Sequence, residues 1–222
     1  MRHEIKTRVT AAEARALRVR LQAVMQRDKH ALQDGTYEIH SVYFDTPTNR
    51  ALMEKQVGMP QRDKYRIRYY NGDTSLIRLE KKSKINGLCS KQSEPLTKEE
   101  AQKIVNGDTA WMATSGRPLL IELYSKMKSQ LLRPKTIVDY TRIPFVYAPG
   151  NVRVTIDYNI RTGLSCTDFL NPDCITIPAG EPVILLEVKW DEYLPGIIRR
   201  AVQVKNRRAG AFSKYQICRI YG

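Results

Sequence analysis

Two neighbouring stretches of the sequence alternate apolar residues with cations, and these cations are the groups that could do chemistry. In "KYRIRYY" (64–70), Lys64, Arg66 and Arg68 fall on one face of a strand, because successive strand side chains point to opposite sides. In "IRLEKKSK" (77–84), four even-numbered residues do the same: Arg78, Glu80, Lys82 and Lys84. So much positive charge on one side of a sheet repels itself unless an anion binds there. The spacing therefore predicts a site for a multiply charged anion.

The two stretches are joined by "YNGDTS", which is typical of a β-hairpin turn. A three-residue loop at 71–73 would pair residue 70 with 74, 68 with 76 and 66 with 78. Even-numbered residues would then oppose each other, and the cations of both strands would share one surface. A two-residue turn at Asn71 and Gly72 would break this arrangement, because a slip of one residue moves every side chain to the other face. We therefore expect the three-residue loop.

The length and composition indicate one sizeable soluble domain over residues 1–222, with two small domains as the alternative. Hydrophobic residues make up 42% and charged residues 27% of the chain, which is typical of a folded globular protein. The first residues, "MRHEIKTRVT", lack the apolar segment of a secretory signal. The longest apolar run, "VILLEV", is far shorter than the roughly 20 residues of a membrane helix. We expect a cytoplasmic protein without a transmembrane segment of its own.

The formal net charge of +14 points to an anionic partner. Both halves of the chain carry the excess, so it does not belong to a detachable basic tail. Nucleic acid, an acidic membrane surface and a phosphate-rich small molecule all fit this charge. A generally basic surface without a specific partner is the simpler alternative.

Capping residues and apolar periodicity predict the helices. Thr10 and Glu13 form a capping box before one helix, and Thr97 and Glu100 form another before a helix that ends at Gly107. Further helices are expected at 117–131 and from Pro195 onwards. Strands are expected at 2–9, 37–46, 64–70, 77–84, 135–147, 152–160, 182–190 and 213–221.

Most of these strands have one charged and one apolar face. In "VRVTIDYNI", Arg153, Thr155 and Asp157 alternate with apolar residues, and in "PVILLEVKW" Glu187 and Lys189 do so. An ordinary sandwich buries the apolar faces and leaves the polar ones to water. If helices cover the apolar faces from outside, the charged faces can close around a hydrated interior. We therefore predict an α+β fold: a closed antiparallel β-barrel, or tunnel, with a polar, basic interior and helices packed outside.

Several enzyme classes are excluded by missing motifs. The sequence contains neither the Walker G-x-x-x-x-G-K-[ST] loop nor G-x-G-x-x-G, and no G-x-S-x-G serine elbow. Its three scattered histidines and four cysteines give no zinc-binding spacing. The remaining pattern, many strand-borne cations with a few carboxylates, suits phosphoryl transfer, where catalysis is mostly positioning and charge neutralisation aided by a metal ion.

Eight segments in this order resemble one known family. They are "RHEIKT", "YEIHSVYFDTP", "KYRIRYY", "RLEKKSK", "VDYTRIPF", "VRVTIDYNI", "LLEVKWDEYLP" and "FSKYQICR". Together they are similar to the VTC (vacuolar transporter chaperone) domain of polyphosphate polymerases, within the triphosphate tunnel metalloenzyme superfamily. The resemblance extends from about residue 2 to 220. It implies a tunnel whose basic walls bind a nucleotide triphosphate and a growing polyphosphate chain.

The resemblance also implies roles for individual residues. Glu187 matches the metal-binding glutamate, with Mn2+ or Mg2+ as the ion. Superfamily members often open with E-x-E-x-K; Arg2 replaces the first glutamate here, and Glu4 remains a candidate ligand. Lys91 and Arg153 look like further phosphate contacts. The positions that match both catalytic and phosphate-binding residues of the family are Lys6, Arg66, Arg68, Lys82, Arg142 and Lys214.

The cations also have simpler interpretations. Arg66 and Arg68 could form a solvated strand face, and Lys81 or Lys84 could serve in place of Lys82. The even parity of the hairpin favours Lys82. A further basic group on or after the last long helix is interpreted as a solvated face or as a docking patch for an acidic partner: Arg199, Arg200, Arg207 and Arg208.

The carboxylates have simpler interpretations too. Glu187 could pair with Lys189 or with an arginine instead of binding a metal. Glu80 is expected to orient lysines through ion pairs rather than to bind a metal.

The resemblance favours transfer of the γ-phosphate of ATP onto a phosphate or polyphosphate acceptor. The partners are then ATP and polyphosphate rather than nucleic acid, and a membrane-protein partner remains open. One alternative is a tunnel-type phosphatase that hydrolyses inorganic or nucleoside triphosphates. The other is a non-catalytic module that binds polyphosphate or another polyanion.

Overall fold

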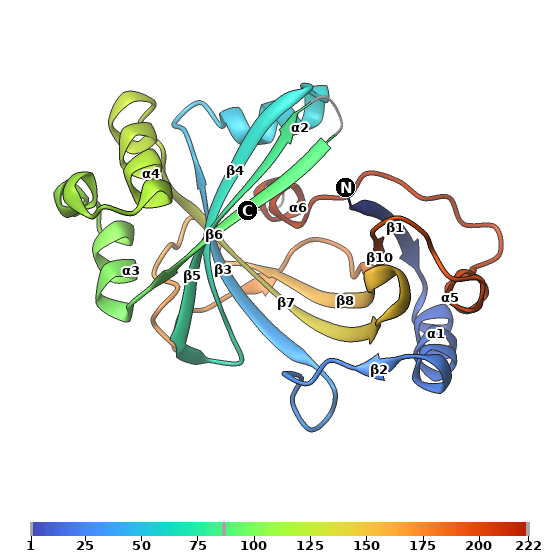
Figure 1. Ribbon diagram of the computed structural model, residues 1–222. Helices are drawn as coiled ribbons and strands as arrows, with labels where there is room; N and C mark the ends of the chain where they lie inside the picture. Colours follow the sequence, from blue (N-terminus) through green and yellow to red (C-terminus); the bar gives the residue numbers. More distant parts are fainter. Residues whose placement is uncertain (1, 86–87, 221–222) are drawn as a thin grey trace. The chain divides into compact units, whose positions relative to one another are not determined.

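The computed structural model describes residues 2–85 and 88–220 of the chain, which forms two compact units (Figure 1). Unit 1 consists of Met1–Glu38, Tyr140–Ile160 and Glu181–Ser213. Unit 2 consists of Ile39–Asp139, Arg161–Gly180 and Lys214–Gly222. Each unit has its own hydrophobic core. A single functional domain over residues 1–222 stays a prediction.

Unit 1 contains strands in the hydrogen-bonded order β1-β10-β8-β7, with a short β2 added to β7. β1 pairs antiparallel with β10, and β10 pairs antiparallel with β8. β7 and β8 both continue into unit 2. The elements are β1 (His3–Val9), α1 (Ala11–Val24), β2 (Gln26–Arg27), β7 (Arg133–Tyr147), the 3-10 turn η2 (Pro149–Asn151), β8 (Val152–Thr162), β10 (Ile184–Trp190) and α5 (Gly196–Ala201).

The two faces of the unit 1 strands differ as predicted. Val154 and Val188 are fully buried, and they pack with Leu17 and Leu21 of α1 and with Ile198 of α5. Helices therefore cover the apolar face. The opposite face carries the charged residues of β1, β8 and β10. The predicted capping box of Thr10 and Glu13 begins α1, which confirms that prediction.

Unit 2 contains the strand order β7-β3-β4-β5-β6, of which β3, β4, β5 and β6 pair antiparallel. Figure 1 shows α3 and α4 beside the long β4–β6 strands. The predicted capping box of Thr97 and Glu100 begins α3. The elements are β3 (Tyr37–Asp45), α2 (Arg50–Val57), β4 (Gln61–Tyr70), β5 (Asp73–Ile85), β6 (Leu88–Leu96), α3 (Lys98–Val105), the 3-10 turn η1 (Ala110–Thr114), α4 (Pro118–Ser129), β9 (Ile177–Pro178) and α6 (Lys214–Ile220).

The odd-numbered residues of β4 and β5 form the core of unit 2. Ile67 and Leu79 are fully buried against Ile104 of α3 and against Leu120 and Leu123 of α4. The even-numbered residues lie on the other face, because strand side chains alternate. The cations of "KYRIRYY" and "IRLEKKSK" therefore share a face, as predicted.

The turn between β4 and β5 differs from the prediction. Tyr70 pairs with Asp73, so the turn has two residues, Asn71 (φ 54°) and Gly72 (φ 72°), both left-handed as a type I′ hairpin requires. A β-bulge between Arg68 and Tyr70 then shifts the register. Arg68 pairs with Arg78 rather than with residue 76. The three-residue loop was wrong, but the bulge restores the even-to-even pairing.

Gly72→Ala is expected to lower the free energy of unfolding by about 1 kcal/mol. An added Cβ would meet no atom within 4 Å, so the expected loss comes from the left-handed backbone alone. Gly196→Ala is the matched control, because its Cβ also meets nothing and its φ is not left-handed. Urea denaturation measures both. Equal stability of the Gly72→Ala variant and the wild type would contradict the turn assignment.

Other parts of the fold also depart from the predictions. The expected strand at 213–221 is the helix α6, in which Tyr215 and Cys218 are buried at helical spacing. The sequence analysis missed α2 and β6. An α+β fold with antiparallel strands and covering helices is confirmed. Closure of the strands into a barrel stays a prediction. Within residues 2–85 and 88–220, no helix combines the length and apolar character needed to span a bilayer.

Candidate functional site

The charged face of unit 2 gathers three cations around one carboxylate. Arg66 on β4 opposes Glu80 on β5, and its Nε and Nη2 lie 2.7 and 2.6 Å from Glu80 Oε2. Lys91 Nζ from β6 lies 2.5 Å from Oε1 of the same carboxylate, and Arg68 Nη1 lies 3.7 Å from Oε2. We call these four residues the Glu80 cluster. With three cations and one carboxylate, the cluster is positively charged.

Two members of the Glu80 cluster are buried. Glu80 is 2% exposed and Arg68 is 3% exposed. Burial alone would raise the pKa of Glu80, but the charges of Arg66, Arg68 and Lys91 outweigh it and keep that pKa well below its ordinary value. The two guanidinium groups have further acceptors, because Arg66 donates to the Tyr43 hydroxyl at 2.7 Å and Arg68 to a neighbouring tyrosine hydroxyl at 3.2 Å. Glu80 therefore pairs with one lysine, Lys91, as predicted, and also with two arginines, which the prediction did not include.

Lys82 lies on the charged face, and Lys81 does not. Lys82 is paired in register with Lys64 on β4 and with Lys91 on β6, so all three lysines share one side of the sheet. Lys81 points the other way and forms an ion pair with Glu122 of α4. Lys82 therefore shares a face with the arginines, as the even parity of the hairpin predicted. Its role toward phosphate stays a prediction.

Lys214 begins α6 rather than lying within a strand. The next residue, Tyr215, stacks on Tyr43 with ring centroids 5.2 Å apart, and its hydroxyl donates to Asp45 Oδ2 at 2.6 Å. Lys64 Nζ lies 5.4 Å from the centroid of the Tyr215 ring. These contacts place the first turn of α6 beside β3, whose Tyr43 also contacts Arg66.

Tyr215→Phe is expected to lower the free energy of unfolding by about 1.5–3 kcal/mol, because the buried Asp45 carboxylate loses a hydroxyl donor. Urea denaturation at pH 7 measures this loss. Tyr124→Phe on α4 is the matched control, since that ring contacts Lys128 through its face and the substitution keeps the ring. The assignment of α6 would be contradicted if both variants were as stable as the wild type.

In unit 1, two carboxylates and two lysines from β1 and β10 form a second group, which we call the Glu187 cluster: Glu4, Lys6, Glu187 and Lys189. Lys6 pairs in register with Glu187, and Glu4 with Lys189. Lys6 Nζ lies 3.5 Å from Glu4 and 3.7 Å from Glu187. Lys189 Nζ lies 3.3 Å from Glu4 and also forms an ion pair with Glu187, which is 5% exposed. Both lysines thus contact both carboxylates.

Arg142 of β7 is fixed by a buried carboxylate on the neighbouring strand. Its Nε and Nη2 lie 2.7 and 2.8 Å from the two oxygens of Asp157, a residue with no solvent exposure. Burial alone would lower the pKa of Arg142. The negative charge of Asp157, with smaller contributions that include Glu187, outweighs this effect, so the pKa of Arg142 is raised above its ordinary value. The Arg142 charge is therefore permanent, and its guanidinium group has one orientation.

Arg153 and Thr155 of β8 lie on the same face as Glu187. Arg153 Nη2 forms an ion pair with Asp28 at 3.2 Å. Thr155 is the register partner of Glu187. In the part of the chain that the structure describes, Arg153 Nε and Thr155 Oγ1 are buried without a hydrogen-bond partner. The Thr155 hydroxyl, opposite Glu187, and the Arg153 Nε–H, opposite Lys189, are therefore available for hydrogen bonds to a ligand.

The metal site expected from the sequence rests on two carboxylates. Among the described residues, no group of three or more His, Cys, Asp or Glu side chains could hold a metal ion. Glu4 and Glu187 share Lys6 and Lys189 as ion-pair partners, so the pairing of Glu187 with Lys189, which was the simpler interpretation, is present. Metal binding by the two glutamates stays a prediction. A metal ion in this place would need further oxygen ligands from its substrate or from water.

Comparison with protein families gives a match to the VTC domain over residues 1–220. The chain belongs to the VTC domain family. The resemblance inferred from the eight sequence segments is thereby confirmed. No curated protein matches this VTC domain.

Solved structures share the fold of this VTC domain at low identity. HpAC1 from Hippeastrum, assigned as an adenylyl cyclase and described as having a dominant triphosphatase activity, aligns with TM-score 0.59 and 14% identity over 98% of this chain and 95% of its own. A protein from Bacillus halodurans assigned as an adenylate cyclase aligns with TM-score 0.50 and 15% identity over 84% and 78%. The PH1012 protein of Pyrococcus horikoshii OT3 aligns with TM-score 0.50 and 14% identity over 93% and 92%.

Some residues that belong to the candidate site or contact it did not stand out in the sequence. Lys189 was considered only as a simple partner of Glu187, although it contacts both carboxylates. Tyr43 was not singled out, because its contact with Arg66 depends on the register of β3 against β4. Asp157 was seen on the charged face, but its pairing with Arg142 requires the neighbouring strand. Only the spacing of Glu187 and Lys189 carried a local signal.

Proposed function

We propose that this VTC domain is a metal-dependent polyphosphate polymerase that transfers the γ-phosphate of ATP to a phosphate or polyphosphate acceptor. The observation that carries the proposal is family membership over residues 1–220. The charged strand faces support it, because phosphoryl transfer depends mainly on positioning and charge neutralisation.

The proposal assigns phosphate binding to the cations of both units. Arginine suits this role because its planar guanidinium group can bind two phosphate oxygens at once. Arg66 and Arg142 are already oriented by Glu80 and Asp157, so little side-chain entropy is lost on binding. The complete proposed phosphate-binding set is Lys6, Arg66, Arg68, Lys82, Lys91, Arg142, Arg153 and Lys214. All but Lys91 and Arg153 are also proposed as catalytic.

The Glu187 cluster is proposed to bind the metal ion. Mn2+ and Mg2+ prefer oxygen ligands, and in phosphate-handling enzymes Mg2+ is held by one or two carboxylates together with the substrate phosphates. Glu4 and Glu187 supply these carboxylates, and the buried Thr155 hydroxyl opposite Glu187 is a further oxygen. When bound, such an ion polarises a phosphoryl oxygen as a Lewis acid. The donor set therefore fits a divalent ion.

The reaction needs no strong general base from the chain. A phosphate or polyphosphate acceptor already carries negative oxygens that can attack. The task of the arginines and lysines is to bind donor and acceptor in line and to reduce their mutual repulsion. A hydrolase would instead have to position a water molecule.

A triphosphatase is the second candidate, and the triphosphatase activity described for HpAC1 favours it. The same cations would then bind inorganic or nucleoside triphosphates. A non-catalytic polyphosphate-binding module would show salt-dependent binding without metal requirement or ATP turnover.

The remaining expectations from the sequence belong to this proposal. They are closure of the strands into a tunnel, one catalytic domain over residues 1–222 and a cytoplasmic location. A membrane-protein partner for export of the product remains an open part of the proposal.

Incubation with ATP and Mn2+, followed by separation of the products by chain length, tests the function. A ladder of phosphate chains is expected, and chelation of the metal should abolish it. Release of orthophosphate alone would favour the triphosphatase. Binding without any turnover would contradict both enzymatic candidates.

A further inference from the structure

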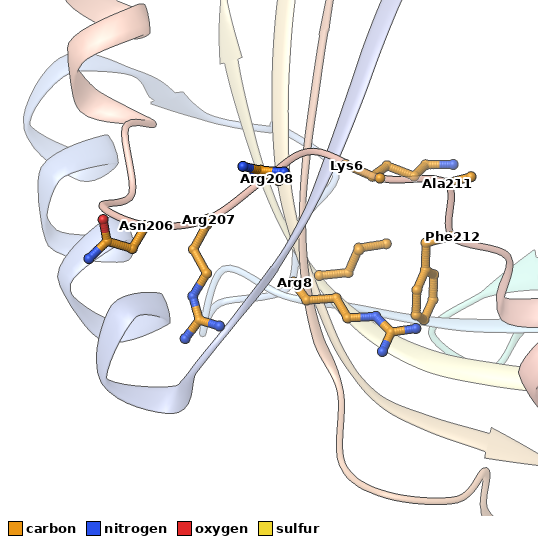
Figure 2. Close-up of a pocket in the computed structure, with 9 residues that line it drawn as sticks. Lys6, Arg8, Asn206, Arg207, Arg208, Ala211 and Phe212 are labelled. Atoms are coloured by element: carbon orange, nitrogen blue, oxygen red, sulfur yellow. The ribbon is translucent and has the colours of Figure 1, made fainter.

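Unit 1 contains a cavity of about 410 Å³ beside the Glu187 cluster. Its lining includes Lys6 and Arg8 of β1, together with Arg207, Arg208 and Phe212 from the segment that follows α5. Figure 2 shows this segment passing over β1, with the Arg8 side chain beside Phe212. The volume lies within the roughly 300–1,000 Å³ of ordinary ligand pockets.

The walls of the cavity are fixed by contacts within unit 1. The Gly210 N–H donates to the Lys6 carbonyl oxygen at 2.9 Å, which ties the segment to β1. The Arg8 guanidinium carbon lies 5.2 Å from the centroid of the buried Phe212 ring. Arg207 Nε lies 3.1 Å from Glu13 Oε1 of α1. The elements around the cavity are therefore connected by a backbone hydrogen bond, a cation–π contact and an ion pair.

The cavity is strongly basic. Four of its lining residues are cations, and none of the described lining residues is a carboxylate. The carboxylates that contact these cations stand outside the lining: Glu13 beside Arg207, and Glu4 and Glu187 beside Lys6. Four cations around one cavity repel each other, so a multiply charged anion would be bound favourably there.

Lys6 connects the cavity with the proposed metal-binding cluster. Its side chain lines the cavity and also contacts Glu4 and Glu187. A ligand with phosphates spaced along a chain could therefore extend from the Glu187 cluster into the cavity. An isolated orthophosphate would use only part of the four cations.

We propose that this cavity is a subsite for phosphate groups of the polyphosphate chain beyond those handled at the Glu187 cluster, with Arg8 and Arg208 as its principal contacts. This inference rests on the proposed function and deepens it. It replaces the interpretation of Arg207 and Arg208 as a solvated face or a docking patch. Arg199 and Arg200 of α5 do not line the cavity and keep the simpler interpretation.

The test compares binding of long-chain polyphosphate and of tripolyphosphate by calorimetry, without ATP. The Arg8→Ala/Arg208→Ala variant is expected to bind the long chain at least about tenfold more weakly, because it loses two charge-assisted contacts. Tripolyphosphate binding should change much less. The control is Arg199→Ala/Arg200→Ala, which removes the same charge from exposed positions of the same unit. It should bind both ligands nearly as the wild type does.

Arg8 covers Phe212, so thermal unfolding of the double variant is measured first. The single variant Arg208→Ala, at an exposed position, provides a second readout that does not depend on this packing. It should weaken long-chain binding several-fold and shorten the products made from ATP. The pocket variants are Arg8→Ala/Arg208→Ala and Arg208→Ala. The subsite would be overturned if these variants and the control lost long-chain binding equally, or if long-chain binding were unchanged in both pocket variants.

Failure of the subsite and failure of the proposed function give different results. If the wild type makes polymer from ATP and the pocket variants match it in binding and product length, the subsite alone is wrong. If the wild type binds long chains through Arg8 and Arg208 but makes no polymer, the polymerase alone is wrong.

Discussion

Glu187→Gln is expected to lower ATP turnover in the presence of Mn2+ by about 10³-fold, while the protein remains folded. Gln preserves the size of this buried side chain and removes its charge. The proposed metal ion would then lose its better-buried carboxylate, and Glu4 alone would remain with Lys6 and Lys189. Steady-state kinetics over a range of Mn2+ concentrations measures the loss.

A second readout separates metal binding from catalysis. Titration of Mn2+ followed by electron paramagnetic resonance should show weaker binding to Glu187→Gln than to the wild type. Glu192→Gln, at an exposed carboxylate shortly after β10, is the matched control and should leave both quantities unchanged. Full turnover and unaltered Mn2+ affinity in Glu187→Gln would show that Glu187 has only the structural role of pairing with lysines.

Glu80→Ala is expected to lower the free energy of unfolding by about 3–5 kcal/mol, the usual loss when one partner of a buried ion pair is removed. The substitution leaves Arg66, Arg68 and Lys91 without their shared carboxylate, and Arg68 is almost fully buried. Urea denaturation at pH 7 measures the effect. Glu94→Gln, which removes a partly exposed partner of Arg117, should lower the same quantity by less than about 1 kcal/mol.

The pH dependence follows from the lowered pKa of Glu80. The stabilisation from this carboxylate is present above its unfolded pKa of about 4.3 and is lost as pH falls toward the folded value. The wild type should therefore lose stability on acidification in that range, and Glu80→Ala should lose less.

If the cluster binds phosphate, tripolyphosphate should stabilise Glu80→Ala at least as strongly as the wild type. Equal stability of variant and wild type at pH 7 would contradict the cluster.

Local sequence signals predicted the elements whose cause is local. The capping boxes at Thr10 and Thr97 began helices where expected, because both partners lie within one turn. The even-numbered cations of β4 and β5 shared a face, because alternation is a property of each strand. The predicted length of the turn was wrong because a two-residue loop followed by a bulge gives the same even-to-even pairing as a three-residue loop.

Contacts between segments that are distant in the sequence could not be predicted from local patterns. Tyr215 was assigned to a strand because "SKYQICRIY" alternates, whereas the helix that it joins is fixed by Asp45, 170 residues earlier. Lys189 contacts Glu4 only because β10 pairs with β1. For the candidate site, the charged strand faces and the family resemblance together predicted the cations and the two carboxylates, and the roles of these residues stay predictions. The ion pairs that orient them came from strand pairing.

The most direct test of the polymerase is to follow labelled phosphate from ATP. With Mn2+ and ATP labelled at the γ-phosphate, the label should enter chains longer than three phosphates, and label at the α-phosphate should remain in nucleotide. Glu187→Gln should form no labelled chains. Recovery of all γ-label as orthophosphate, or as unreacted ATP, would contradict a polyphosphate polymerase.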